Sequence, residues 1–167
     1  MKKISLFLAF SIYLFFSHNI FSQTFEVPTN YVFKTKEDFA KYEKDIIQAI
    51  NWLETTPIDK QSNKRKGVNA FLISWLTGSP NVSIALTEYT TELSSKNPDL
   101  LISFMGGWTK EKLQNPSLND VLKLNIAGVK SIIKTYKLGG AKKDKNVEKL
   151  LLMDDQQLEN WCRSKVK

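Results

Sequence analysis

The sequence contains one histidine and one cysteine, and these two shortages exclude most familiar catalytic and metal-binding sites. The histidine, His18, lies in an N-terminal segment that we predict to be removed during export, so the mature chain is expected to contain none. Ser-His and Cys-His nucleophile pairs and histidine-ligated metal sites are then excluded. Cys162 can form no internal disulfide and supplies too few ligands for a structural zinc site. Because the chain also lacks a P-loop and a dinucleotide-binding fingerprint, we expect no metal and no cofactor and assign no catalytic residue.

Long hydrophobic runs are also scarce, and the one at the N-terminus is typical of a secretory signal. Lys2 and Lys3 precede the apolar residues 4–16, a run shorter than the roughly 20 residues that a membrane-spanning helix needs. We predict that residues 1–22 are a signal peptide and that cleavage follows Ser22, the small residue best placed beyond the run. The chain is therefore expected to be periplasmic or secreted, with no transmembrane span after processing.

Positive charge is unevenly distributed along the chain. The net charge is +7, and residues 101–167 carry +6 whereas residues 23–100 carry −1. Such an excess favours anionic partners, among them lipid head groups and acidic polysaccharides, although a lysine-rich solvated surface explains it equally well. We expect no nucleic acid among the partners.

The spacing of apolar residues is helical almost throughout, and the five prolines fall between the periodic segments. We predict an all-α fold, a compact irregular bundle of about six helices in a single domain over residues 36–167, preceded by a short extended arm over residues 23–35. Helices are expected to begin near residues 36, 62, 81, 98, 118 and 146, with a restart at Asp154 or Asp155. The irregular spacing of these starts argues against a helical repeat.

Helix-capping residues set the expected boundaries. Thr35 is expected to cap the first helix and Asn97 the fourth, while Ser117 with Asp120 is similar to a capping box for the fifth. Gly78 should end the second helix, and Gly139 with Gly140 the fifth.

The most informative segment is residues 104–108, in which two adjacent glycines interrupt a helical pattern. Each glycine costs a helix about 1 kcal/mol relative to alanine, so some compensating role is expected. Either another helix passes close by, or the helix breaks to form a pocket beside a tryptophan. On the second alternative the ligand-binding residues would be Trp75, Phe104, Gly106, Gly107 and Trp108.

Charged residues offer two further candidate sites. The lysines of the fifth helix recur at offsets that place them on one side, as a stripe able to contact an anionic surface, and they are Lys123, Lys130, Lys134 and Lys137. Two carboxylate pairs, Glu88 with Glu92 and Asp154 with Asp155, have the residue type that glycoside hydrolysis uses. We favour a simpler explanation for both pairs, in which Glu88 and Glu92 are ordinary solvated residues and the aspartates cap a helix. Cys162, one helical turn from Leu158, is expected to be a small buried side chain.

Three segments, FLISWLTGSPNV (71–82), LLISFMGGWTKEKL (100–113) and KKDKNVEKLLLMDDQQLENW (142–161), resemble a group of small exported all-helical proteins of Gram-negative bacteria. The resemblance covers most of the predicted mature chain. It implies an exported location, but it implies no activity and no functional residues.

Three functions are compatible with these features. The first is a non-enzymatic envelope protein that binds a protein, a peptide or an amphipathic ligand through a helical groove, with tryptophans as anchors. The second is a carboxylate-dependent hydrolase acting on an envelope glycan or peptide. The third is an electrostatic binder of anionic lipid or polysaccharide. Carboxylates that meet in one cleft would favour the hydrolase, and dispersed carboxylates would favour binding.

Cleavage of the predicted signal can be tested directly. Intact-mass measurement of protein recovered from periplasm or medium should give a species that begins at Gln23. A membrane-bound species that retains Met1 would contradict the prediction.

Overall fold

A computed structural model describes residues 24–166, so the predicted signal peptide lies outside the described residues. The described chain is all-helical, as predicted, and it contains no strand. Its seven helices are α1 (Lys36–Leu53), α2 (Ser62–Gly78), α3 (Glu88–Ser94), α4 (Asp99–Gln114), α5 (Val121–Lys137), α6 (Lys145–Leu151) and α7 (Asp155–Lys165).

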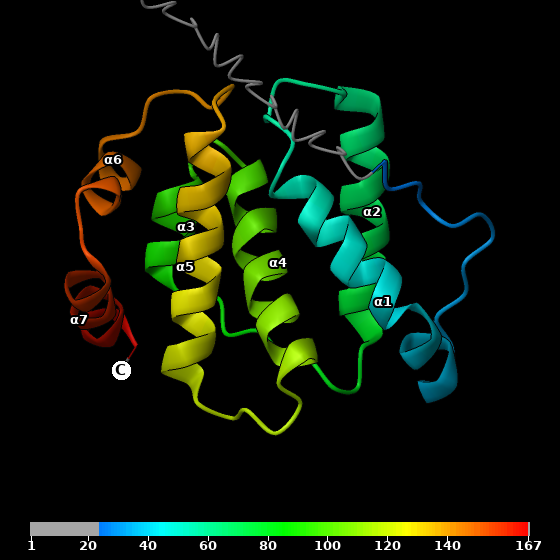
Figure 1. Ribbon diagram of the computed structural model, residues 1–167. Helices are drawn as coiled ribbons and strands as arrows, with labels where there is room; N and C mark the ends of the chain where they lie inside the picture. Colours follow the sequence, from blue (N-terminus) through cyan, green and yellow to red (C-terminus); the bar gives the residue numbers. More distant parts are fainter. Residues whose placement is uncertain (1–23, 167) are drawn as a thin grey trace, which may run out of the picture.

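The bundle is organised around α4 and α5, which lie side by side at its centre (Figure 1). Helices α1 and α2 flank α4 on one side, and α6 and α7 lie beyond α5 on the other. The short helix α3 packs against α4 and also contacts α6. Every other helix is therefore positioned, directly or through one neighbour, by the central pair.

Local capping interactions set most of the helix ends where the sequence predicts them. The Thr35 Oγ1 atom accepts a hydrogen bond from the Asp38 backbone N–H at 3.2 Å, and the Asp38 carboxylate accepts one from the Thr35 N–H at 2.9 Å. Asp154 caps α7 in the same reciprocal way with Gln157. Gly139 and Gly140, with φ of +89° and +80°, end α5 in the left-handed region that favours glycine.

The predicted caps of α4 and α5 are wrong. Pro98, and not Asn97, is the N-cap of α4, and the Asn97 side chain instead forms hydrogen bonds with the backbone of Lys142. Ser117 belongs to the turn that follows α4, and Asp120 itself is the N-cap, accepting hydrogen bonds from the N–H groups of Leu122 and Lys123 at 3.0 and 3.2 Å. An N-cap acceptor must directly precede the first helical residue, because only there can it reach the free N–H groups of the first turn.

The predicted start of the third helix near residue 81 is also wrong. Helix α3 begins at Glu88, and residues 82–87 form neither helix, turn nor bend. The Thr87 N–H donates to Thr90 Oγ1 at 3.2 Å, which marks a helix start at that point. The β-branched side chains of Val82 and Ile84 also favour extended over helical backbone.

The N-terminal arm wraps over the first two helices as an extended tail rather than a strand. Phe25 is buried at its start. Tyr31 and Phe33 stack on each other at 5.2 Å between ring centroids, and both contact the ring of Phe71 in α2. The arm thus covers aromatic surface that α1 and α2 would otherwise expose.

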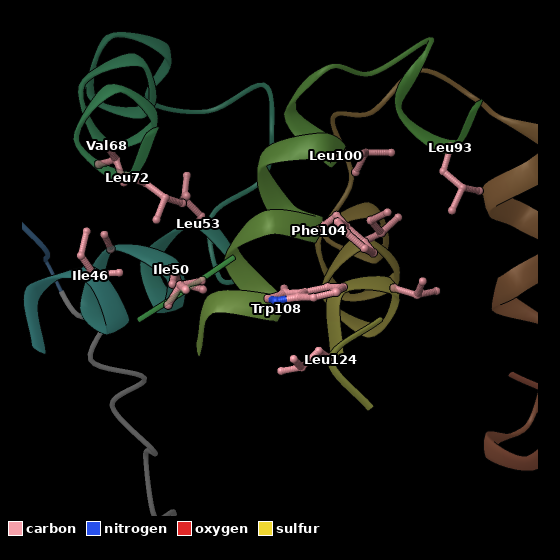
Figure 2. Close-up of a cluster of buried hydrophobic side chains, with 14 of the residues drawn as sticks. Ile46, Ile50, Leu53, Val68, Leu72, Leu93, Leu100, Phe104, Trp108 and Leu124 are labelled. Carbon is pink, nitrogen blue, oxygen red and sulfur yellow. The ribbon is translucent and has the colours of Figure 1, made fainter. Parts of the chain in front are cut away.

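The core is a continuous cluster of buried apolar side chains (Figure 2). Ile46, Ile50 and Leu53 of α1 lie toward Val68 and Leu72 of α2. The rings of Phe104 and Trp108 project from α4 on the side of α5 (Figure 2). The largest side chains in this cluster are Trp52, Trp75, Trp108, Phe71 and Phe104.

The central helices approach so closely that side chains are excluded at two positions. A Cβ atom added to Gly107 of α4 would lie 2.5 Å from the Ala127 carbonyl oxygen and 2.6 Å from the Ser131 Cβ atom of α5. A Cβ atom added to Gly128 of α5 would lie 2.6 Å from the Phe104 ring. Helix α4 runs unbroken through Gly106 and Gly107, so close packing, rather than a break in the helix, explains the paired glycines.

The close contact predicts opposite effects for two glycine-to-alanine substitutions. Gly107→Ala should lower the free energy of unfolding by about 1 to 3 kcal/mol, because the added methyl group collides with the α5 backbone. Gly67→Ala in α2 is the matched control: no atom lies within 4 Å of the added methyl group, so helix propensity should stabilise the protein by about 0.5 to 1 kcal/mol. Urea denaturation of both variants measures the two signs, and a stabilising Gly107→Ala would refute the packing explanation.

Candidate functional site

The five residues predicted to bind a ligand lie in the core. Trp75 and Phe104 have no exposed surface and Trp108 is 2% exposed, while Gly106 and Gly107 are buried against neighbouring helices. The Trp75 indole N–H donates to the Phe39 carbonyl oxygen at 3.0 Å, as expected for a structural tryptophan. Packing accounts for their positions, and their role in ligand binding stays a prediction.

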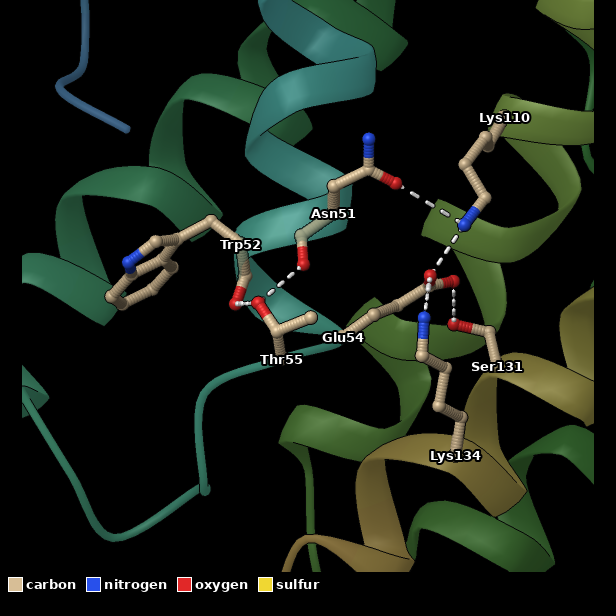
Figure 3. A network of polar contacts seen from close by, with 7 residues as sticks. All are labelled: Asn51, Trp52, Glu54, Thr55, Lys110, Ser131 and Lys134. Atoms are coloured by element: carbon tan, nitrogen blue, oxygen red, sulfur yellow. Dashed lines mark hydrogen bonds and ion pairs between the residues drawn. The ribbon is translucent and has the colours of Figure 1, made fainter. Parts of the chain in front are cut away.

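A buried carboxylate is the centre of a polar cluster (Figure 3). Glu54, at the C-terminal end of α1, is only 3% exposed. One of its oxygens pairs with Lys110 of α4 and, at 3.1 Å, with Lys134 of α5. The other oxygen accepts a hydrogen bond from the Ser131 hydroxyl at 2.8 Å. The cluster joins three helices at one point.

The balance of forces on Glu54 favours its ionised form. Burial raises the pKa of the carboxyl, but the hydrogen bond and charge of Lys110, with the hydrogen bonds from Ser131 and Lys134, outweigh burial and hold the pKa below its ordinary value. Both oxygens are occupied by protein donors. This cluster therefore stabilises the fold, and its carboxylate is not available to a substrate.

The four lysines of the predicted stripe on α5 are exposed, but two of them form ion pairs with carboxylates of other helices. Lys130 forms an ion pair with Asp155 of α7 at 2.6 Å, and Lys134 reaches Glu54. Lys123 and Lys137 form no ion pair within residues 24–166. The pairs reduce the charge that the stripe offers to an anionic surface, and such binding stays a prediction.

The four candidate carboxylates are dispersed. Asp154 caps α7, and Asp155 pairs with Lys130. Glu88 and Glu92 line a shallow hollow on α3. Among the pockets found in the described chain, none brings the two pairs together. The aspartate pair and the glutamate pair thus lie at different places on the surface. This dispersal favours a ligand-binding protein over a carboxylate-dependent hydrolase.

The single cysteine is a core residue, as predicted. Cys162 has no exposed surface, and burial together with the charge of Glu159 raises the pKa of its thiol to about 11. The thiol is therefore protonated at neutral pH and is a poor nucleophile.

A depression lined largely by aliphatic side chains lies between α2, the connecting segment 79–87 and α4, and we call it the α2–α4 groove. Its volume is about 420 Å³, within the range of small-ligand sites. It is lined by Ile73, Leu76, Thr77, Ser79, Val82, Ser83, Ile84, Leu86 and Met105, none of which is charged. The groove thus offers aliphatic surface and hydroxyl groups.

Two large aliphatic side chains are exposed at this groove. Ile73 of α2 is 43% exposed and Leu86 is 50% exposed, although most residues of this size are buried in the core. The predicted helix starting near residue 81 would have included Leu86. Because that helix does not form there, the sequence did not indicate that Leu86 lies beside Ile73. The alternating apolar residues Val82, Ile84 and Leu86 were the available signal for an extended segment.

A smaller hollow of about 200 Å³ lies between α3, α6 and α7. Trp161, the one tryptophan outside the fully buried core, contributes to it together with Tyr89. Their rings pack edge to face at 5.4 Å between centroids, so the contact between α3 and α7 occupies part of the available aromatic surface.

Two further features are absent from residues 24–166. In that part of the chain, no group of three or more histidine, cysteine, aspartate or glutamate side chains is arranged to hold a metal ion. No helix within residues 24–166 combines the length and the apolar character needed to cross a membrane.

The Glu54 cluster predicts a pH-dependent contribution to stability. Glu54→Gln should lower the free energy of unfolding at pH 7 by about 2 to 4 kcal/mol, since it leaves two lysines without their buried counter-ion. The folded-state pKa of Glu54 lies below the ordinary value of 4.5, so its stabilisation is present above that pH and is lost as the pH falls through the folded-state pKa. The difference between wild type and variant should therefore shrink below pH 4.5.

The control is Glu159→Gln, which removes an exposed ion pair with Arg163 and should cost under about 0.5 kcal/mol. Denaturant titrations at several pH values measure both variants. Equal losses in the two variants at pH 7 would contradict a stabilising role for the Glu54 cluster.

Comparison of the chain with protein-family models, with curated proteins and with solved structures finds no match. The resemblance to small exported helical proteins therefore stays a prediction, and the site is interpreted from its own geometry.

Proposed function

We propose that this protein is a non-enzymatic, exported envelope protein that binds an apolar part of a partner protein, a peptide or an amphipathic ligand in the α2–α4 groove. The observation that carries the proposal is the exposure of Ile73 and Leu86 beside an uncharged groove of about 420 Å³. Exposed aliphatic side chains that gather at a depression are typical of an interaction site.

The composition of the groove indicates the kind of ligand. A chain with a net charge of +7 has no charged side chain in the lining of this groove, so binding there would depend on apolar contact and not on electrostatic attraction. The hydroxyl groups of Thr77, Ser79 and Ser83 can orient a polar group of the ligand.

The predicted signal peptide supports the envelope location, because export would place the groove in the periplasm or outside the cell. The dispersed carboxylates and the buried, protonated Cys162 give little support to the hydrolase alternative. The paired lysines of α5 likewise give limited support to electrostatic binding.

The groove can be tested with Nile red, a neutral dye whose fluorescence rises in apolar surroundings. We expect saturable binding to the wild-type protein, weakened about threefold to tenfold by Leu86→Ser, because the substitution removes an aliphatic wall of the groove. Leu152→Ser is the matched control, since Leu152 is 86% exposed and lies outside the groove. Its affinity for the dye should equal that of wild type.

The same three proteins then serve as baits in pull-downs from envelope extract. A partner that wild type and Leu152→Ser retain and that Leu86→Ser loses would connect the groove to its biological ligand. Dye binding that both variants leave unchanged would overturn the assignment of the site.

A further inference from the structure

The segment that forms one wall of the α2–α4 groove has the character of a β-strand. Residues 82–87 contain no turn or bend. Burial alternates over the first four of them: Val82 is buried and Ile84 half-buried, while Ser83 and Ala85 are exposed. Leu86 follows on the side of Val82 and Ile84, where it lines the groove and is 50% exposed. This two-residue period is the pattern of a strand with one face on a core.

The backbone of this segment is unpaired. Within the described chain, no hydrogen bond joins the N–H or C=O groups of residues 82–86 to another backbone group or to a side chain. Unpaired backbone groups of an extended segment are a ready template for another strand. In Figure 1 the connection between α2 and α3 passes behind α4, and the described residues contain no strand that could pair with it.

A third observation lies at the same place. The Ser79 hydroxyl oxygen lines the groove and is buried, yet it has no hydrogen-bond partner among the described residues. Buried hydroxyl groups in folded proteins almost always have a partner. An unsatisfied hydroxyl group therefore lies in the wall of the groove.

We propose that the α2–α4 groove binds an extended peptide segment of another protein, which adds as a β-strand to residues 82–86 and places an apolar side chain between Ile73 and Leu86. This inference rests on the proposed function and specifies its ligand. In strand addition, backbone hydrogen bonds supply affinity, and pockets for alternate side chains supply specificity. An acyl chain could fill the groove but would leave the backbone of residues 82–86 unpaired.

A second copy of this chain is the less favoured occupant. The side chains of its own segment 82–86 that lie on the face opposite Val82 and Ile84 are Ser83 and Ala85. Both are too small to fill a groove of about 420 Å³. A foreign peptide with larger alternate side chains fits that volume better.

The test uses a fluorescent seven-residue peptide of alternating valine and threonine, with acetylated and amidated ends, and fluorescence anisotropy with the purified protein. Two further peptides carry N-methyl groups on the valine amides alone or on the threonine amides alone. Because successive amides of a strand point to opposite edges, one of the two should bind about tenfold more weakly and the other should retain its affinity. Leu86→Ser should weaken the unmodified peptide, and Leu152→Ser should not.

Hydrogen exchange gives a direct structural measure. Alternate amides of residues 82–86, those on the edge that pairs with the peptide, should exchange rapidly in the free protein and become protected when the unmodified peptide is added, while the amides between them stay unprotected. Equal affinity for all three peptides, or unchanged exchange, would overturn strand addition. If peptide binding fails but Nile red still binds and Leu86→Ser weakens it, only strand addition is wrong and the proposed function of the groove stands. If Nile red does not bind either, both proposals are wrong.

Light scattering tests whether a second copy of this chain occupies the groove. The protein should be monomeric at the concentrations used, and the peptide should not change its mass beyond one added peptide. A dimer that dissociates when the peptide is added, or that Leu86→Ser abolishes, would assign the segment to self-association and overturn the proposal.

Discussion

The close contact between α4 and α5 is the constraint on which the rest of the bundle depends. Gly107 and Gly128 lack side chains where the other helix passes, so the Ala127 carbonyl oxygen and the Phe104 ring occupy the space that Cβ atoms would need. Since α1 and α3 pack on α4, and α6 and α7 pack on α5, a displacement of this central pair would move every other contact in the core. Gly107 and Gly128 each lower the intrinsic stability of their own helix, but their lack of a side chain allows α4 and α5 to pack closely.

The buried ion cluster is built on the same contact. Ser131 packs beside Gly107 and also donates its hydroxyl to Glu54, so apolar packing and polar contact converge at one residue. Lys110 and Lys134 each lie one helical turn beyond this point, on α4 and α5, and bring the two positive charges to the end of α1. A buried carboxylate that lost one of these partners would destabilise the fold. The cluster therefore favours the one register of α1, α4 and α5 in which all three partners reach Glu54.

The periphery is less regular than this centre, and the candidate binding surface lies there. The chain leaves α2 at Gly78 and does not become helical again until Glu88, so an extended segment with unpaired backbone borders the α2–α4 groove. Connecting segments held by a rigid scaffold are a common location for binding sites. Here the scaffold is the α4–α5 pair, and Met105 of α4 forms part of the groove lining.

The sequence by itself determined the all-helical class and most helix ends, because helical periodicity and capping residues such as Thr35, Asp154 and Gly139 act through neighbours within a few positions. It also restricted the available chemistry, through its single histidine and cysteine. Only the tertiary structure decided which partner faces Gly107, which lysines meet Glu54, and that Leu86 shares a groove with Ile73. These contacts join positions far apart in the chain, and the free energy of packing there outweighs local preference, so no pattern within a short window could specify them.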